Sequence, residues 1–146
     1  MIIYRRPTPT DAQELLQLGT RMTEGTAFAP PTLEKVNKLI ARPSSYGYGE
    51  CAVADGVIVG FFCGYVGETY LNNQINAYEQ GVFIAPEYRG GSIAFRMVKN
   101  FEAWARAKNA ENVWMGQSVG QKQDSTLRFF ERLGYACQGF MTHKKL

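Results

Sequence analysis

The sequence predicts a mixed α/β fold, in which a twisted and mostly antiparallel sheet carries helices on both faces. Strand-like segments follow one another between residues 48 and 84, and from residue 92 onward helical and strand patterns alternate. The chain has 146 residues, of which 45% are hydrophobic and 20% charged, as in globular proteins rather than disordered or fibrous ones. We therefore expect one domain over residues 1–146, built around a buried core.

The first third of the chain is expected to hold a short strand and two helices. Residues 1–6 are rich in β-branched and aromatic side chains, which favour a strand, and Pro7 blocks its continuation. Thr10 and Gln13 have the spacing of a capping box for the first helix. Thr32 can cap a second helix, which a proline ends.

Consecutive strands should form the middle of the sheet. The dipeptide Asp55-Gly56 has the chemistry of a tight hairpin turn, so residues 50–54 and 57–65 are expected to pair antiparallel. Residues 74–84 have the pattern of a third strand, which an Ala-Pro pair ends.

The last third of the chain should alternate between helix and strand. A long amphipathic helix starts at Ser92, because bulky side chains follow it at three- and four-residue spacing. The residues at this spacing are Ile93, Met97, Phe101, Trp104 and Lys108. The remaining elements are a strand over residues 112–119, a helix over 124–133 and a closing strand or hairpin over 135–144. The full order is therefore β-α-α-β-β-β-α-β-α-β.

Charge and cysteine content exclude several classes of protein. Lys and Arg exceed Asp and Glu by 16 to 13, and a net charge of +3 is too small to favour nucleic acid as the main partner. Cys51, Cys63 and Cys137 form no C-x-x-C pair, so neither a disulfide framework nor a metal site is indicated. No signal-peptide pattern is present, and residues 57–66 are far shorter than the roughly 20 apolar residues that span a bilayer. We expect a cytoplasmic protein without a metal or a membrane partner.

The stretch from Gly81 to Ala94 reads as a strand, a basic glycine-rich turn and a helix start. Gly90 and Gly91 allow positive φ and a close approach of the backbone to a ligand, and the free N–H groups of the helix start favour an anion. Arg89 adds a fixed positive charge. The alternative is that the glycines only form a tight turn and Ser92 only caps the helix. Neither G-x-x-x-x-G-K-[ST] nor G-x-G-x-x-G is present, so another phosphate carrier is required.

This turn and the order of elements resemble the GNAT superfamily of acetyl-CoA-dependent N-acetyltransferases, over nearly the whole chain. The family pattern is V-x-P followed by [QR]-x-x-G-x-[GA], and here Ile84-Ala85-Pro86 and Arg89 to Ala94 occupy those places. Ser92 stands where the pattern prefers glycine.

A second resemblance to the same family runs from Leu127 to Tyr135. Phe130 falls there at the place where many members have the tyrosine that protonates the leaving thiolate. The R-G-G-S turn together with residues 101–105 is most similar to members of phage and prophage origin.

The resemblance implies a cofactor site in a split between two parallel strands, here residues 74–84 and 112–119. The pantetheine arm of acetyl-CoA would lie along the backbone of Val82, Phe83 and Ile84, whose N–H would donate to the oxyanion. The pyrophosphate would lie on Arg89, Gly90, Gly91, Ser92, Ile93 and Ala94.

The reaction is the attack of an amine on a thioester, and a base must take the proton of the alkylammonium ion. Many members of the family have a glutamate early in the strand that ends at the cofactor turn. In this sequence that residue is Glu79, between Tyr78 and Gln80. If Glu79 lines an apolar cleft, its pKa should rise toward neutrality. The alternative is a solvent-facing glutamate near the start of a strand.

No residue is a clear general acid, because Phe130 cannot donate a proton. Ser118, Ser125 and Tyr88 could donate one, but a strand end, a helix cap and a turn explain them equally well, and water is a further donor. His143 is expected in a solvated tail. The aromatic residues expected to pack in the core are Phe101, Trp104 and Trp114. The resemblance assigns to the acceptor pocket Glu24, Phe28, Tyr46 and Tyr48.

We therefore expect an N-acetyltransferase that passes an acetyl group from acetyl-CoA to a primary amine by direct attack in a ternary complex. The amine belongs to a small molecule or to a protein lysine or N-terminus, and a carboxylate at the floor of the cleft favours a cationic acceptor. None of the cysteines is placed to hold a covalent acetyl group. A homodimer is possible.

Two other functions stay open. Ser92 and Phe130 would fit a protein of this fold that binds acyl-CoA without catalysis and acts as a sensor or an interaction module. A nucleic-acid-associated phage protein would use a set of basic residues. These are Arg5, Arg6, Arg106, Lys108, Lys144 and Lys145.

Overall fold

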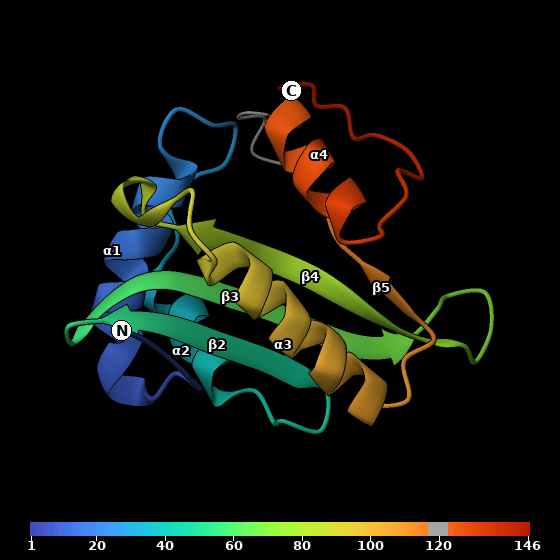
Figure 1. Cartoon of the computed structure of the whole chain (residues 1–146), viewed down its shortest axis with the longest axis horizontal. Helices are drawn as coiled ribbons and strands as arrows, with labels where there is room; N and C mark the ends of the chain where they lie inside the picture. Colours follow the sequence, from blue (N-terminus) through green and yellow to red (C-terminus); the bar gives the residue numbers. More distant parts are fainter. Residues whose placement is uncertain (117–122) are drawn as a thin grey trace.

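The computed structural model describes residues 1–116 and 123–146 (Figure 1). The strands are β1 (Ile2–Arg5), β2 (Gly47–Ala54), β3 (Val57–Glu68), β4 (Ile75–Ile84) and β5 (Asn112–Trp114). The helices are α1 (Ala12–Thr23), α2 (Leu33–Ala41), α3 (Ile93–Ala107) and α4 (Gln123–Arg132), with short 3-10 turns η1 (Pro9–Asp11) and η2 (Pro86–Tyr88). In the described part of the chain the sheet order is β1-β2-β3-β4-β5, antiparallel except for the parallel β4–β5 pair. The predicted mixed, mostly antiparallel sheet is confirmed.

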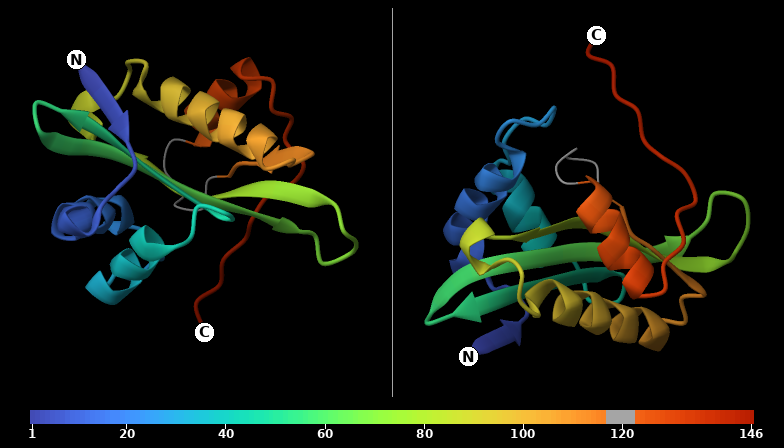
Figure 2. Two further views of the ribbon diagram at one scale, coloured as in Figure 1. Left: turned by 90° about the horizontal axis from the view of Figure 1, so that it is seen from below. Right: turned by 45° about the horizontal axis from the view of Figure 1, so that its top comes forward.

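Helices cover both faces of the sheet, as predicted: α1 and α2 lie on one face, α3 and α4 on the other (Figure 2, left). The core on the α3 side contains Phe62, Met97 and Phe101, which are fully buried. The smaller core on the α1 side contains Leu15 and Leu18. Of the side chains predicted for the buried face of α3, Ile93, Met97 and Phe101 are buried and Trp104 is partly buried against them, whereas Lys108 lies just beyond the helix.

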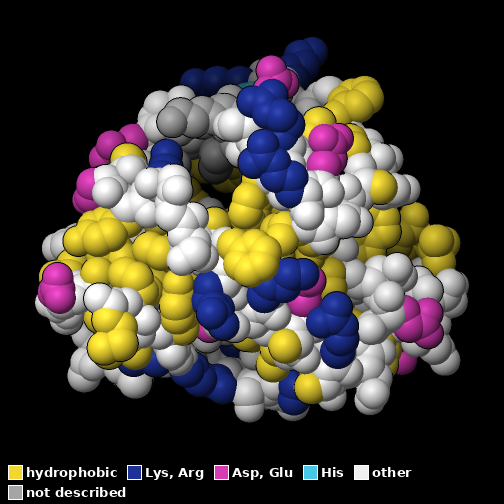
Figure 3. All heavy atoms as spheres, in the orientation of Figure 1, with side chains coloured by type: hydrophobic (Ala, Val, Ile, Leu, Met, Phe, Trp, Pro, Cys, Tyr) yellow, Lys and Arg dark blue, Asp and Glu magenta, His cyan; other side chains and the backbone are white. Residues whose placement is uncertain are grey.

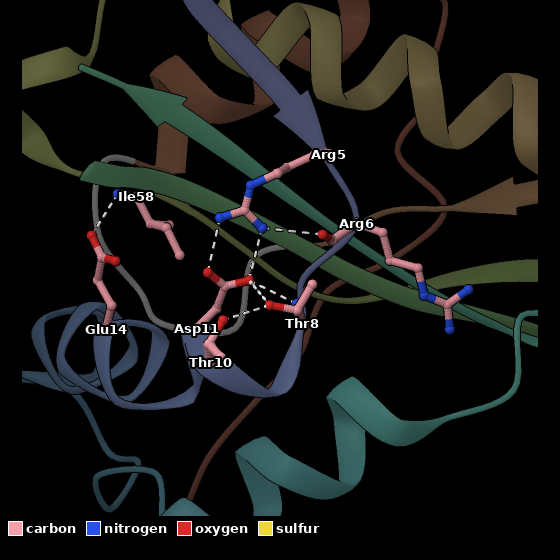
Figure 4. Close-up of polar contacts among 7 residues, drawn as sticks. All are labelled: Arg5, Arg6, Thr8, Thr10, Asp11, Glu14 and Ile58. Atoms are coloured by element: carbon pink, nitrogen blue, oxygen red, sulfur yellow. Dashed lines mark hydrogen bonds and ion pairs between the residues drawn. The ribbon is translucent and has the colours of Figure 1, made fainter. Parts of the chain in front are cut away.

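The start of α1 differs from the sequence prediction. Thr10 does not cap the helix; η1 precedes it, and the Asp11 carboxylate accepts the Thr8 N–H at 2.7 Å. The same carboxylate accepts both Nη groups of Arg5 on β1, at 2.7 and 2.8 Å (Figure 4). A charged acceptor shared by a backbone N–H and a guanidinium outcompetes a neutral hydroxyl. The hydrogen bonds from Arg5, and to a smaller extent those from Thr8, lower the pKa of Asp11 to about 2.

The hairpin at Asp55-Gly56 is confirmed. Both residues have positive φ, +49° and +80°, as the mirror-image turns of two-residue hairpins require. Its strands are longer than predicted, because Gly47 already pairs with Tyr65.

The closing strand predicted over residues 135–144 is wrong. Residues 135–146 have no regular secondary structure and form a tail that leaves α4 (Figure 2). Phe140 and Met141 are 91% and 77% exposed, so a strand here would bury no apolar surface. The described part of β5 also offers an edge of only three residues for pairing. His143 lies in this exposed tail, as predicted. Trp114 is 45% exposed, so its expected core packing is also wrong; it lies on that edge strand.

Candidate active site

Strands β4 and β5 separate after a short paired stretch. Their parallel register joins Asn76 to Asn112 and Tyr78 to Trp114, and within the described residues it ends there. Figure 1 shows the two strands diverging from this point. Along the rest of β4, residues 79–84, one edge pairs with β3, and the other edge has no strand partner among residues 1–116 and 123–146. The far part of the predicted second strand, residues 117–119, lies outside the described residues.

Two backbone N–H groups of β4 point into this split. Ala85 N–H donates to the Val59 carbonyl at 2.8 Å, so these two residues form a hydrogen-bonded pair of the antiparallel ladder. Such pairs alternate, so Ile84 and Val82 direct their N–H and C=O groups away from β3, whereas Phe83 directs its groups toward β3. Of the three residues predicted to line the pantetheine arm, two offer backbone groups to the split.

A β-bulge interrupts β4 at the start of the split. Cys63 pairs with Gly81 and Gly64 pairs with Glu79, so Gln80 is an extra residue with no partner on β3. A Cβ on Gly64 would lie 2.6 Å from the Tyr78 carbonyl oxygen, so this close approach requires glycine. The sequence prediction had no bulge here; glycines inside two neighbouring strand patterns were the available signal.

Glu79 follows directly after the last β4–β5 pair, at the point where the strands separate. Its Oε2 accepts the Gly116 N–H at 3.3 Å, a contact that bridges the split. Burial raises the pKa of Glu79 to about 7, while the Gly116 hydrogen bond acts in the opposite direction. Cys63 lies near this carboxylate, and burial raises the pKa of its thiol to about 12. The carboxyl is therefore poised to accept a proton near neutral pH, whereas the thiol stays protonated.

The glycine turn at the other end of the split leaves backbone donors open. Gly90 has φ of +85°, and a Cβ added to Gly90 or Gly91 would meet no atom within 4 Å. The first backbone hydrogen bond of α3 runs from Arg96 N–H to the Ser92 carbonyl at 2.9 Å, and the Ser92 side chain makes no capping bond. The N–H groups of residues 91–95 thus have no acceptor among the described residues. This arrangement suits an anion.

Arg89 is partly committed to holding the turn. Its Nε donates to the Ile84 carbonyl at 2.8 Å, and its guanidinium lies 5.0 Å from the centre of the Phe83 ring. On the other side of the turn, Arg21 of α1 pairs with Glu87 at 2.8 Å. Arg89 therefore closes the end of β4 as well as bringing positive charge to the turn.

The surface is hollowed between α4 and the segment that joins β4 to α3, with hydrophobic side chains visible inside the hollow (Figure 3).

The residues expected at the acceptor pocket are not all brought together. Phe28 and Tyr46 are about half exposed on loops. Tyr48 is instead part of β2, and its ring packs on Phe101 and Trp104 with centroids 5.1 Å apart in both cases. The alternation of β2 thus points this ring at α3, whereas Phe28 and Tyr46 lie on exposed loops.

The candidate general acids remain scattered. Phe130 packs its ring against Phe129 and Tyr135. Ser125 lies in the first turn of α4, Tyr88 is in η2, and Ser118 lies outside the described residues. Across residues 1–116 and 123–146, no group of three or more His, Cys, Asp or Glu side chains is arranged to hold a metal ion. In the same residues, no helix is long and apolar enough to span a membrane.

Comparison with known proteins identifies the fold and the family. The structure aligns with the aminoglycoside N-acetyltransferase AAC(6')-Iy, solved with the bisubstrate analogue CoA-S-monomethyl-acetylneamine, at a TM-score of 0.80 and 15% identity over 100% of this chain and 98% of the other. It also aligns with a Trypanosoma brucei acetyltransferase (TM-score 0.79, 18% identity, 100% of both chains). A third match is ribosomal-protein-alanine N-acetyltransferase from Brucella melitensis biovar Abortus (0.76, 14%, 100% and 99%).

Among curated proteins, none matches this sequence significantly. The family model described as Acetyltransferase (GNAT) family matches residues 12–135, which is most of the chain. The chain therefore belongs to the GNAT acetyltransferase family.

Proposed function

We propose that residues 1–146 form one catalytic domain that transfers an acetyl group from acetyl-CoA to a primary amine. The observation that carries the proposal is the position of Glu79: a half-buried carboxyl at the point where β4 and β5 separate, on the strand that ends at the glycine turn. AAC(6')-Iy, which shares the fold, was solved with CoA and with a CoA bisubstrate analogue.

The residues of the split fit the cosubstrate. The open edge of β4 would pair the backbone of Val82 and Ile84 with the amides of the pantetheine arm. The open N–H groups of Gly91, Ser92, Ile93 and Ala94 at the start of α3 would hold the pyrophosphate, while Gly90 forms the turn and Arg89 adds positive charge. Bound there, acetyl-CoA supplies a thioester carbonyl that an amine can attack.

The chain's own groups would handle the proton and the charge. With a pKa of about 7, Glu79 is largely ionised at slightly alkaline pH and can take a proton from an alkylammonium acceptor, directly or through water. The Ile84 N–H, which points into the split, is the proposed donor to the developing negative charge on the carbonyl oxygen. Because the Cys63 thiol stays protonated, we propose direct attack in a ternary complex rather than a covalent acetyl-cysteine.

A cationic amine is the proposed acceptor. The Glu79 carboxylate attracts an ammonium group, and solved proteins of this fold are named as aminoglycoside and ribosomal-protein-alanine acetyltransferases. We therefore propose an aminoglycoside-like molecule, a polyamine or a protein amine as the acceptor.

A second candidate is acyl-CoA binding without turnover. The observation in its favour is Phe130, which gives α4 an aromatic packing residue in place of a hydroxyl donor. Such a protein would still need the glycine turn but would not need Glu79.

Calorimetric titration with acetyl-CoA, followed by a CoA-thiol release assay over a panel of aminoglycosides, polyamines and a lysine peptide, separates the two. Binding followed by thiol release with at least one amine supports catalysis. Binding without release on any acceptor supports the second candidate, and no binding contradicts both. Light scattering with and without acetyl-CoA tests whether the chain forms a homodimer.

A further inference from the structure

Arg42 joins helix α2 to the bulge that carries Glu79. It is the residue after α2, and its N–H closes the helix on the Leu39 carbonyl. Its Nη1 donates to Gln80 Oε1 at 2.6 Å, and its Nη2 donates to the Gly64 carbonyl at 2.9 Å. One guanidinium therefore contacts β3 and β4 together, at the place where their register shifts.

Two of the groups that Arg42 contacts, on Gln80 and Gly64, define the bulge. Gln80 is the inserted residue, and Gly64 is the register partner of Glu79. A bulge frees the inserted residue from the ladder, so its conformation depends on what its side chain and its neighbours contact. Arg42 supplies that contact from α2, and the Glu79–Gly116 hydrogen bond supplies one across the split.

Arg42 is packed more tightly than an exposed surface arginine. A Cβ on Gly47 would lie 2.9 Å from Arg42 Cβ, and Arg6 Nη2 donates to the Arg42 carbonyl at 2.9 Å. The Arg42 Nε is buried and, among the described residues, has no acceptor. By contrast, no residue of α2 itself is fully buried. The guanidinium thus adds polar contacts with the sheet to the apolar packing of Val36 and Ile40 of α2.

We infer that Arg42 is a positioning residue for acetyl transfer: by holding Gln80 and the Gly64 carbonyl, it fixes the bulge that keeps Glu79 at the point where β4 and β5 separate. The inference rests on the proposed function for the role of Glu79. Arg42 acts through the neighbouring strands rather than on Glu79 itself, since its side-chain hydrogen bonds go to the Gln80 side chain and to the Gly64 and Tyr48 carbonyls. A fork of donors is needed to reach both strands, which a lysine ammonium cannot reproduce.

Loosening the bulge should change how Glu79 titrates. Within residues 1–116 and 123–146, the charged and titratable groups that face this region are Cys63 and Tyr65 from β3, Arg42 from the end of α2, and Tyr78 on the same strand. Burial is the cause of the raised pKa of Glu79. When the Arg42 contacts with Gln80 and Gly64 are removed, water reaches the Glu79 carboxyl and its pKa falls toward the ordinary value of 4.5.

The test is an NMR titration that needs no substrate. Arg42→Gln, Arg42→Lys and the control Lys38→Ala are labelled with ¹³C at glutamate and ¹⁵N at glycine, and the Glu79 carboxyl and the Gly116 amide are followed from pH 4 to 9. Lys38 is a matched control because it is a cation on α2 whose ion pair, in the described part of the chain, is with exposed Glu34. We expect Lys38→Ala to titrate like the wild type, and the Glu79 midpoint of Arg42→Gln to fall by about one pH unit or more. Arg42→Lys should lie between them.

A folded Arg42→Gln or Arg42→Lys protein in which Glu79 and Gly116 titrate as in the wild type would overturn the inference. If Arg42→Gln does not fold, Arg42→Lys decides it by the same criterion. The kinetic counterpart is a loss of kcat of roughly 10- to 100-fold in Arg42→Gln, with KM for acetyl-CoA changed less than about twofold, because the reacting groups are misplaced while the glycine turn is untouched. A wild-type protein that acetylates no amine would refute the proposed function, and the NMR result would still decide the role of Arg42.

Discussion

The two ends of the open part of β4 are built in different ways. At its C-terminal end, the glycine turn offers backbone N–H groups from residues that follow one another in the sequence. At its start, the surroundings of Glu79 come from the end of α2, from β3 and from the residues after β5. One end is a local backbone conformation, and the other is an assembly of distant parts.

This difference separates binding from chemistry. A backbone anion site depends on φ angles and on a helix start, so it should tolerate changes elsewhere in the domain. A half-buried carboxyl beside a bulge depends on each element that keeps water from it. Substitutions at the turn should therefore change mainly the affinity for acetyl-CoA, and substitutions around Glu79 should change mainly the rate and its dependence on pH.

The largest effect is expected from Glu79→Gln. The amide keeps the size of the side chain but cannot take a proton, so kcat/KM for the amine should fall by about 10²- to 10⁴-fold, while the Kd for acetyl-CoA stays within about twofold. In the wild type, kcat/KM should fall as pH drops below about 7, and this limb should disappear in the variant. Steady-state kinetics from pH 5.5 to 9, with calorimetry for the Kd, checks both. A wild-type rate in the variant would remove Glu79 from the reaction.

The same substitution should make the protein more stable at alkaline pH. The pKa of Glu79 is raised on folding, so the folded state holds this proton more tightly, and ionisation costs stability as pH rises from about 4.5 to about 7. Above pH 7 Glu79→Gln should gain about 1–3 kcal/mol, a gain that is absent at pH 4. Urea denaturation at pH 4, 6 and 8 measures this. An equal stability of the two proteins at pH 8 would mean that Glu79 is not buried as an unpaired acid.

Gly90→Ala tests the turn. With φ of +85°, an alanine is strained whatever space surrounds it, so the turn should shift and the acetyl-CoA affinity should fall by about 1–2 kcal/mol with little change in kcat at saturation. Gly56→Ala is the control, because Gly56 has φ of +80° and equally open surroundings in the β2–β3 hairpin. It should lose similar stability and keep the affinity. Equal losses of affinity in both variants would show that general destabilisation, rather than the turn, sets binding.

How well the sequence predicts each end follows the same division. The hairpin, the strand, the turn and the start of α3 were predictable because neighbouring residues specify them. The bulge at Gln80 and the clamp by Arg42 were not, because they depend on contacts between residues far apart in the chain. The closing strand predicted over residues 135–144 is wrong for a related reason. A strand is favoured where its side chains cover an apolar surface, and Phe140 and Met141 cover none in the described part of the fold.

Asp11→Asn, on the α1 face of the sheet, should have the smallest effect and leave both ends of β4 unchanged. The folded pKa of Asp11, about 2, is lower than its ordinary 3.8, so its contribution to stability is complete above about pH 4 and is lost as pH falls toward 2. The variant should lose roughly 1 kcal/mol at pH 7, since Arg5 is partly exposed to solvent, and should flatten the acid limb of the stability curve. Thermal unfolding from pH 2 to 7 measures this. Asp11→Asn could also change kcat or the Kd for acetyl-CoA by more than about twofold. That result would contradict the separation between binding at the glycine turn and catalysis at Glu79, because a loss of stability far from both sites would then affect both.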